Sequence, residues 1–226
     1  MAMKLIIIRH GETDYTAEKR YCGSAIDASL NNVGVKQAQK VRRLLQKETV
    51  DVVYTSPLIR TIQTTDIIFK NHPVKIYKTS LLRESNLGKW EGHTLSEIKK
   101  LFPEDIKKWY KDPLRYGATD GETPIILQRR VKRFLAKLSN TYNNNIGCSR
   151  RLATLCHRQT RLWRERTKII PDGTSFIDAR GVTIAIVTHS GPFRIIIGEI
   201  SGNGLKDFWG YEPKTCEYKI VKFKSR

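Results

Sequence analysis

Short apolar runs rich in β-branched residues recur along the chain and predict its strands. The predicted strands span residues 4–9, 51–55, 74–77, 182–187 and 217–224. The run at 182–187 is almost unbroken, which is typical of a central strand buried on both faces of a sheet. Residues 217–224 instead alternate between apolar and polar positions, as an edge strand does.

Between the strands, apolar residues recur at helical spacing and predict four longer helices. The first begins at Asn31 or Asn32 and ends near Glu48, and the others cover residues 57–69, 123–138 and 193–200. Ser56 and Pro57 resemble an N-cap followed by a proline in the first helical turn. Because strands and helices alternate, we expect an α/β fold: a three-layer sandwich with a mostly parallel central sheet and helices on both faces.

One segment, residues 147–181, breaks this pattern. It holds seven Arg and one Lys and has no clean periodicity. A structureless loop of this length is unusual inside a compact domain. Without it, residues 143–146 would form a short polar turn leading into the strand at 182–187. We therefore expect a single domain over residues 1–226 with a basic surface insertion at about 147–181, which is either a genuine basic arm or sequence foreign to the domain, such as translated non-coding sequence.

Composition favours a cytoplasmic protein. No stretch approaches the roughly 20 apolar residues of a membrane span, and only four apolar residues follow the first basic residue, too few for a signal peptide. The four cysteines form no Cys-x-x-Cys pair, which argues against a disulfide framework. Cys148, Cys156 and His157 make a weak metal-ligand set because of their odd spacing, so we expect neither a metal nor another cofactor.

The charge is unusually positive. Lys and Arg number 41 against 22 Asp and Glu, which gives a net charge of +19. Such a surface attracts anions and speeds their arrival. Nucleic acid and small phosphate esters are both candidate partners on this ground, and net charge alone does not choose between them.

The first predicted strand runs directly into Arg9-His10-Gly11-Glu12-Thr13. The carboxyl end of a strand in an α/β sheet is where ligand sites are built. Arginine binds phosphate oxygens through a planar fork of donors, and histidine can attack phosphorus and hold the phosphoryl group. Glycine lets the backbone approach a ligand closely. This combination at this place favours phosphoryl chemistry.

The motif and its position resemble the histidine phosphatase superfamily, which includes cofactor-dependent phosphoglycerate mutases. In that family His10 is the nucleophile and Arg9 clamps the phosphoryl group. The resemblance implies three further catalytic residues: Arg60 after the second strand as another clamp, Glu84 in the segment 82–92 as proton donor, and His189 after the fourth strand as a donor to the phosphoryl oxygens.

The resemblance also implies substrate-binding roles for a second group, consisting of Gly11, Thr16, Cys22, Gly23 and Ser190. Two of these depart from the family pattern. Thr16 replaces an Asn that touches the phosphate, and Ser190 replaces a Gly. Glu91 competes with Glu84 by composition, but it matches a structural position of the family.

The segments 88–94 and 109–123 resemble the small phosphatases of the α-ribazole phosphatase type, and the longer substrate-enclosing segment of the mutases is missing. We therefore expect a metal-independent phosphatase that hydrolyses a small phosphomonoester through a phosphohistidine on His10. Two alternatives stay open: a phosphoglycerate mutase-type phosphotransferase, and a non-catalytic binder of phosphorylated ligands or nucleic acid. A small phosphorylated metabolite is the expected partner, nucleic acid is less favoured, a membrane is not expected, and the protein would be a monomer or homodimer.

Overall fold

The computed structural model of the chain describes residues 2–155, 181–206 and 208–224, with the backbone alone over 143–155. Five strands form one sheet in the order β3-β2-β4-β1-β5. Their bounds are Ala2–Arg9 (β1), Val52–Thr55 (β2), Lys75–Lys78 (β3), Thr183–Thr188 (β4) and Tyr218–Lys224 (β5). The first four strands are parallel and β5 pairs antiparallel with β1. The sequence correctly predicted a central β4 and an edge β5.

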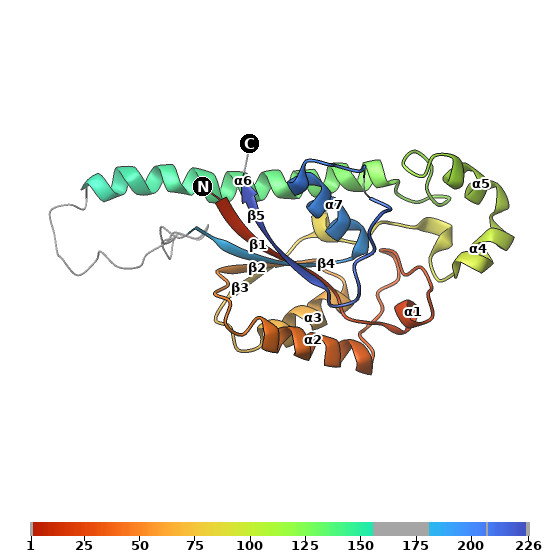
Figure 1. Cartoon of the computed structure of the whole chain (residues 1–226), viewed down its shortest axis with the longest axis horizontal. Helices are drawn as coiled ribbons and strands as arrows, with labels where there is room; N and C mark the ends of the chain where they lie inside the picture. The colour runs from red at the N-terminus through yellow and green to blue at the C-terminus, as the bar shows by residue number, and fades with distance from the viewer. Residues whose placement is uncertain (1, 156–180, 207, 225–226) are drawn as a thin grey trace.

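Helices lie on both faces of this sheet (Figure 1), which confirms the predicted three-layer sandwich. One face carries α6 and α7, and the other carries α2 and α3. The helices are Asp14–Ala17 (α1), Asn32–Leu44 (α2), Ile59–Phe69 (α3), Leu95–Leu101 (α4), Pro103–Lys111 (α5), Pro124–Leu155 (α6) and Ser190–Ser201 (α7). Two 3-10 turns, Ser80–Leu82 (η1) and Gly88–Trp90 (η2), lie between β3 and α4.

Strand β1 shows how the apolar pattern makes two cores. Leu5 and Ile7 belong to the core beneath α6 and α7, whereas Ile6 and Ile8 belong to the core beneath α2 and α3. All four are fully buried. Because successive side chains point to opposite faces, a strand covered on both sides must be apolar at every position.

Three local predictions were wrong. Helix α3 begins at Ile59 with Leu58 as its N-cap, so Ser56 is not the cap; its hydroxyl contacts a histidine instead. Helix α2 ends at Leu44, four residues before the predicted end. The polar, glycine-containing sequence of residues 14–30 predicts a loop, but this stretch contains the four-residue helix α1, which Thr13 caps.

Helix α6 continues to Leu155, well past the polar turn expected at 143–146. The first nine residues of the predicted insertion are therefore helical. Residues 156–180, with Cys156 and His157 of the weak metal-ligand set, lie outside the described part of the chain. The insertion stays a prediction.

The parallel strands bring separate polar residues to one edge of the sheet. The amide of His10 donates to the carbonyl of Thr188 at the end of β4. The amide of Ser56, just past β2, donates to the carbonyl of Val187 on the same strand. Residues that follow β1, β2 and β4 therefore meet at the carboxyl edge of the sheet, where the sequence predicted a site.

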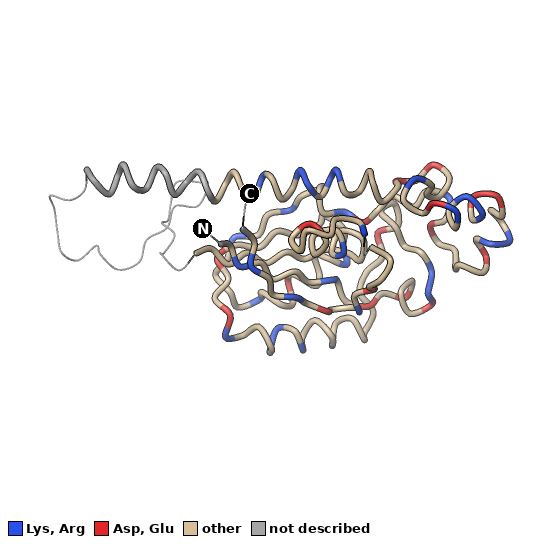
Figure 2. The backbone as a smooth tube through the Cα atoms, turned by 45° about the horizontal axis from the view of Figure 1, so that its top comes forward, with Lys and Arg blue, Asp and Glu red and all other residues tan. Residues whose placement is uncertain are grey.

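Figure 2 shows Lys and Arg along α6, along the strands and over the α4–α5 region, where Asp and Glu lie among them. Within the described residues, no helix combines the length and apolar character needed to span a bilayer.

Candidate active site

Two buried imidazoles face each other at the carboxyl edge of the sheet. His10 follows β1 and His189 follows β4, and these strands are adjacent and parallel. The ring centroids are 5.1 Å apart, with the ring planes at 62°. The two histidines are 4% and 0% exposed. The structure therefore brings together two predicted catalytic residues that lie 179 positions apart in the sequence.

The contacts of His10 leave one ring nitrogen free to act as a nucleophile. Its Nδ1 lies 2.7 Å from the carbonyl oxygen of Gly11. A carbonyl only accepts, so Nδ1 carries the hydrogen and Nε2 carries the lone pair. Burial lowers the pKa of His10 well below its ordinary value, and the cations of Arg60 and Arg9 lower it further. The imidazole is thus neutral at pH 7.

His189 has the opposite tautomer. The Nε–H of Arg60 donates to its Nδ1 at 3.2 Å, so the hydrogen of His189 is on Nε2. This Nε2–H donates to the hydroxyl of Ser56 at 2.8 Å. Burial and then the Arg60 cation lower the pKa of His189 well below the ordinary value. His189 is therefore a neutral hydrogen-bond donor.

Arg60, in the first turn of α3, links this centre to the loop 23–26. Its side chain is almost completely buried. One terminal nitrogen donates to the carbonyl of Ile26 at 3.0 Å and the other to the carbonyl of Gly23 at 2.6 Å. A guanidinium has five N–H donors in a fixed plane, so Arg60 holds the loop and His189 and keeps further donors for an anion.

The same loop is held from its other side by Glu91. The carboxylate of Glu91 accepts from the amides of residues 24, 25 and 26, at 3.0 to 3.3 Å. These contacts fit the structural position that the sequence assigned to Glu91. Gly23 has φ +56°, and a Cβ there would lie 2.0 Å from Glu91 Oε1, so glycine is required. Half-buried Cys22 adjoins it, and burial raises the pKa of its thiol.

Glu84 lies against the first turn of α7. Its carboxylate accepts from the amide of Ser85 at 2.9 Å and from the amide of Gly191 at 3.2 Å. The positive end of a helix dipole attracts a carboxylate in this place. Gly191 leaves room for this carboxylate, because a Cβ there would lie 2.5 Å from Glu84 Oε1. The Glu84 carboxylate also raises the pKa of Arg9, against the larger lowering by burial, so the predicted proton donor and the first clamp interact electrostatically.

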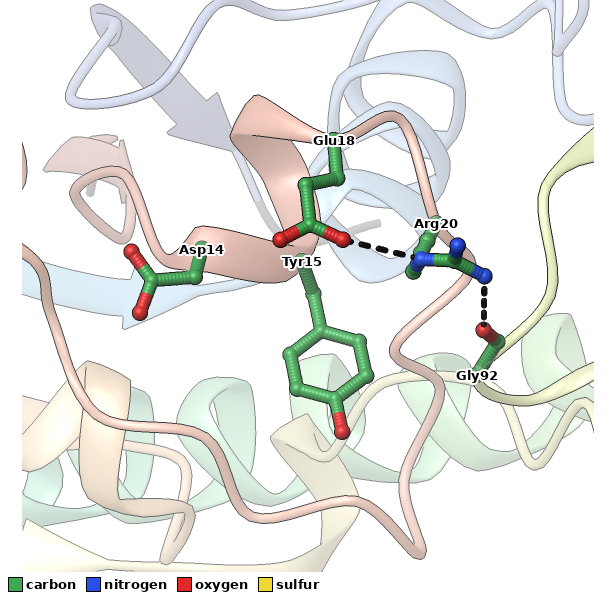
Figure 3. A pocket seen from close by; sticks show the side chains of 5 residues that line it. All are labelled: Asp14, Tyr15, Glu18, Arg20 and Gly92. Carbon is green, nitrogen blue, oxygen red and sulfur yellow. Dashed lines mark hydrogen bonds and ion pairs between the residues drawn. The ribbon is translucent and has the colours of Figure 1, made fainter.

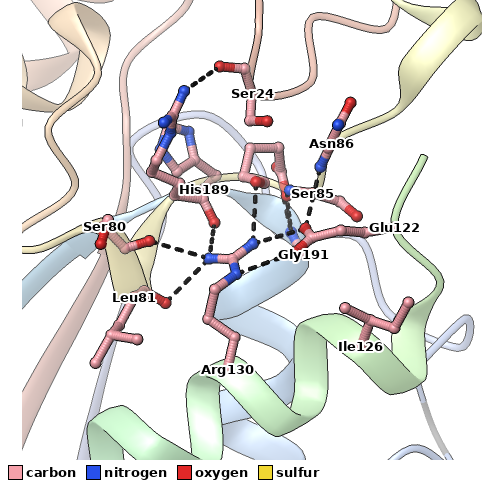
Figure 4. A network of polar contacts seen from close by, with 12 residues as sticks. Ser24, Ser80, Leu81, Ser85, Asn86, Glu122, Ile126, Arg130, His189 and Gly191 are labelled. Atoms are coloured by element: carbon pink, nitrogen blue, oxygen red, sulfur yellow. Dashed lines mark hydrogen bonds and ion pairs between the residues drawn. The ribbon is translucent and has the colours of Figure 1, made fainter. Parts of the chain in front are cut away.

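Arg130, on α6, lies beside the backbone of Ser80 and Leu81 (Figure 4) and holds the segment that presents Glu84. Its guanidinium donates to the carbonyls of Leu81, Arg83 and Glu84 at 2.8 to 3.1 Å. It also forms a bidentate ion pair with Glu122, at 2.8 and 3.2 Å. Sequence analysis missed this role, because an arginine on an amphipathic helix is usually a surface residue.

Arg9 closes the site on the side of β5. Its terminal nitrogen NH1 donates to the carboxylate of Glu212 at 2.9 Å and to the carbonyl of Pro213. Burial lowers the pKa of Arg9, while the carboxylates of Glu84 and Glu217 oppose this shift. Its Nε is buried with no hydrogen-bond partner among the described residues.

The two departures from the family pattern lie in different surroundings. The hydroxyl of Ser190, next to His189, donates to Glu212 at 2.8 Å. The hydroxyl of Thr16 belongs to the capping box of α1: it donates to the carbonyl of Thr13 at 2.8 Å and accepts from the Thr13 amide at 2.8 Å. The structure thus groups Ser190 with Arg9, whereas Thr16 is bound within its own helix turn.

A pocket of about 290 Å³ lies beside α1 (Figure 3). It is lined by Asp14, Tyr15, Glu18, Arg20 and Gly92. Its one cation, Arg20, is paired with Glu18 and Glu97. None of the predicted catalytic residues lines it. Among the described residues, no three or more His, Cys, Asp and Glu side chains are grouped to hold a metal ion.

Comparison with known proteins identifies the family. A family model of the histidine phosphatase superfamily (branch 1) matches residues 5–160. Phosphoserine phosphatase 1 of Hydrogenobacter thermophilus is 26% identical over 224 residues, which cover 99% of this chain and 88% of that protein. Adenosylcobalamin/alpha-ribazole phosphatase of Escherichia coli is 31% identical over 137 residues, which cover 61% of this chain and 67% of that protein.

A solved structure confirms the fold. The alpha-ribazole phosphatase of Shigella flexneri superposes with a TM-score of 0.72 at 24% identity, over 96% of this chain and 89% of that one. At this identity the likeness speaks for the fold alone. The family model, in contrast, spans more than half of the chain and includes the segment with both Arg9-His10 and Glu84. The chain therefore belongs to the histidine phosphatase superfamily, and its relatives named here are phosphatases.

Proposed function

We propose that this chain hydrolyses small phosphomonoesters without a metal ion, through a phosphohistidine formed on Nε2 of His10. The contact between Nδ1 of His10 and the carbonyl oxygen of Gly11 is the observation that carries the proposal. The Gly11 carbonyl fixes the hydrogen on Nδ1, and burial keeps the ring neutral. A buried neutral imidazole with its free lone pair beside two arginines is suited to attack a phosphate dianion.

In the first step, Nε2 of His10 forms a bond to phosphorus while the bond from phosphorus to the ester oxygen breaks. The electron pair leaves with that oxygen, which takes a proton from Glu84 and departs as an alcohol. Arg9, Arg60 and the Nε2–H of His189 hold the non-bridging oxygens, and their charge and dipoles stabilise the transition state. To do so, His189 exchanges the Ser56 hydroxyl for a phosphoryl oxygen.

In the second step, water attacks phosphorus and Glu84 takes its proton. The bond between phosphorus and Nε2 breaks, the imidazole recovers its lone pair, and inorganic phosphate leaves. The arginines supply the positive field that a metal ion provides in other phosphatases. The names of the relatives support a phosphatase, and they differ in the ester that they name, so the leaving group stays open.

The test is phosphate release from p-nitrophenyl phosphate and a panel of phosphorylated metabolites, in EDTA and without added metal. We expect turnover in EDTA, loss of at least 1,000-fold in His10→Asn, and an acid-labile label on the wild type after a brief exposure to ³²P-labelled substrate. His72→Asn, at the far end of α3, is the matched control and should keep both turnover and label.

Three results would contradict the proposal. Full activity of His10→Asn would show that His10 is not the nucleophile. Transfer of the phosphoryl group between hydroxyls with little phosphate release would instead support a mutase. Saturable binding of phosphorylated ligands with no turnover would support a non-catalytic binder.

A further inference from the structure

Three donors beside the proposed phosphoryl site converge on one carboxylate. Glu212, in the loop between α7 and β5, accepts from Arg9 NH1 at 2.9 Å and from the Ser190 hydroxyl at 2.8 Å. It is also ion-paired with Arg194 NH2. Two guanidinium groups and a hydroxyl directed at the same carboxylate make an anion-binding arrangement.

These donors come from rigid elements of the site itself. Arg9 ends β1, and Ser190 follows His189. Arg194 lies four residues after Ser190 on α7, hence on the same face of the helix. Its guanidinium lies over the rings of Phe208 and Trp209, 5.3 and 6.0 Å from their centroids.

Arg194 is also coupled to the proposed catalytic groups. Burial lowers its pKa, while the Glu84 carboxylate raises it and the Arg9 cation lowers it. Its Nε, like that of Arg9, is buried with no hydrogen-bond partner among the described residues. A buried donor without a partner is unfavourable, so both cations retain a donor for another anion.

The partners of this cluster differ sharply in burial. The side chains of Arg9 and Arg194 are 14% and 12% exposed, whereas that of Glu212 is 58% exposed. An exposed carboxylate on a loop gains little from an ion pair and is easily exchanged. The cations are therefore the fixed part of the cluster, and the carboxylate is the replaceable part.

We propose that Arg194, Ser190 and Arg9 form a second anion position, which binds a carboxylate or second phosphate of the substrate. Glu212 occupies this position as an internal carboxylate, and the substrate displaces it. The inference rests on the proposed phosphatase function and narrows its substrates to esters that carry a further anionic group near the scissile phosphate.

The test uses matched pairs of esters that differ in the second anion. O-phosphoserine is compared with phosphoethanolamine for a carboxylate, and propane-1,3-diol bisphosphate with 3-hydroxypropyl phosphate for a second phosphate. We expect the wild type to favour the doubly anionic member of at least one pair by 10-fold or more in kcat/KM. The pair that shows the preference identifies the anion.

Variants then assign the preference to the cluster. Arg194→Gln should reduce the ratio within the pair to near 1, and Arg194→Lys should keep part of it, because a lysine retains the charge but loses the fork. Glu212→Gln, an exposed change, should lower KM for the doubly anionic ester several-fold by removing the competing charge. Arg133→Gln, an exposed arginine on α6, is the control and should change neither value.

The inference is overturned if the wild type does not distinguish the members of either pair, or if Arg194→Gln lowers both members equally. If no ester is turned over at all, the phosphatase proposal fails first. The second anion position is then tested by calorimetry of the same esters with His10→Asn. Binding of the doubly anionic ester at least 10-fold tighter, lost in Arg194→Gln, supports it, and equal binding overturns it.

Discussion

Arg60 and His189 form a hydrogen bond in which the guanidinium Nε donates to Nδ1 of the imidazole, over 3.2 Å. The same guanidinium holds the carbonyls of Gly23 and Ile26. One planar group therefore sets the tautomer of a proposed catalytic histidine and the position of a loop 34 to 37 residues away in sequence. Lysine cannot reproduce this, because its single ammonium group cannot reach in three fixed directions.

Arg60→Lys should consequently lower kcat at least 100-fold although the positive charge is kept. Amide hydrogen exchange in the loop 23–26 should become faster, because two carbonyl anchors are lost. Arg43→Lys, an exposed change on α2, is the control, because it also replaces an arginine by a lysine and keeps the positive charge. Unchanged exchange with unchanged kcat would show that Arg60 does not organise the site.

The two buried histidines make stability depend on pH. Burial, with the Arg60 cation, holds the pKa of His10 and of His189 well below 6.5 in the folded state. The unfolded chain binds protons at these residues near pH 6.5, so it binds more protons than the folded chain below that pH. The free energy of unfolding therefore falls as pH drops below about 6.5, by up to about 1.4 kcal/mol per pH unit for each histidine.

Urea unfolding of wild type and His10→Asn between pH 7.5 and 5.0 checks this expectation. Carboxylates contribute to acid sensitivity in both proteins, so the difference between the two curves isolates the histidine. The variant should lose stability less steeply below pH 6.5. Parallel curves would mean that the pKa of His10 is the same in the folded and unfolded states.

The sequence predicted well where the proposed site residues lie, because they follow strands. His10 and His189 each come directly after an apolar run, and parallel strands carry such residues to one edge. Ser56 was misassigned because a serine before a proline is typical of a helix N-cap. Only the position of β4 shows that the hydroxyl of Ser56 forms a hydrogen bond with His189. Local pattern does not contain that contact.

The supporting residues were missed for a related reason. Arg130 lies at a polar position of an amphipathic helix. The hydrophobic pattern of that helix is the same whether Arg130 faces water or the backbone of residues 81–84. Glu212 lies in a loop whose course depends on tertiary packing. Arg194 could have been found from its spacing. It lies four residues after Ser190, so the two side chains share one face of the helix that follows His189.

Arg130 provides a third prediction, since it acts on catalysis through the backbone that carries Glu84. Arg130→Met should lower kcat 10- to 100-fold with little effect on KM, because the proton donor shifts while the phosphate clamps stay. It should also lower the free energy of unfolding by about 2 kcal/mol, because buried hydrogen bonds to a charged group are lost.

A fall in kcat with an unchanged KM distinguishes a role in positioning Glu84 from a general loss of structure. Arg129→Met, the exposed neighbour on α6, should keep both kinetic constants and the stability. A rise in KM of Arg130→Met with kcat unchanged would mean that Arg130 affects substrate binding, and the assignment to Glu84 would be wrong.

Gly191→Ala tests the position of Glu84 by adding one methyl group. The new Cβ would lie 2.5 Å from Glu84 Oε1 and 2.9 Å from Leu127 Cδ2, so the carboxylate must move. The backbone offers no obstacle, because Gly191 is in the first turn of α7 and alanine favours a helix by up to about 1 kcal/mol over glycine. The steric contact lowers stability and the helix propensity raises it, so the two effects oppose each other, and the steric contact displaces Glu84.

We expect the thermal midpoint of Gly191→Ala to change by only a few degrees and its kcat to fall at least 10-fold. The step that releases an alcohol should suffer most, so an ester with a good leaving group, such as p-nitrophenyl phosphate, should lose less activity than an alkyl phosphate, whose oxygen needs the proton. Ser201→Ala, at the other end of α7, should show neither effect. Equal losses on both esters would show that Glu84 is not the acid for the leaving group, and Glu91 would then be the next carboxylate to test.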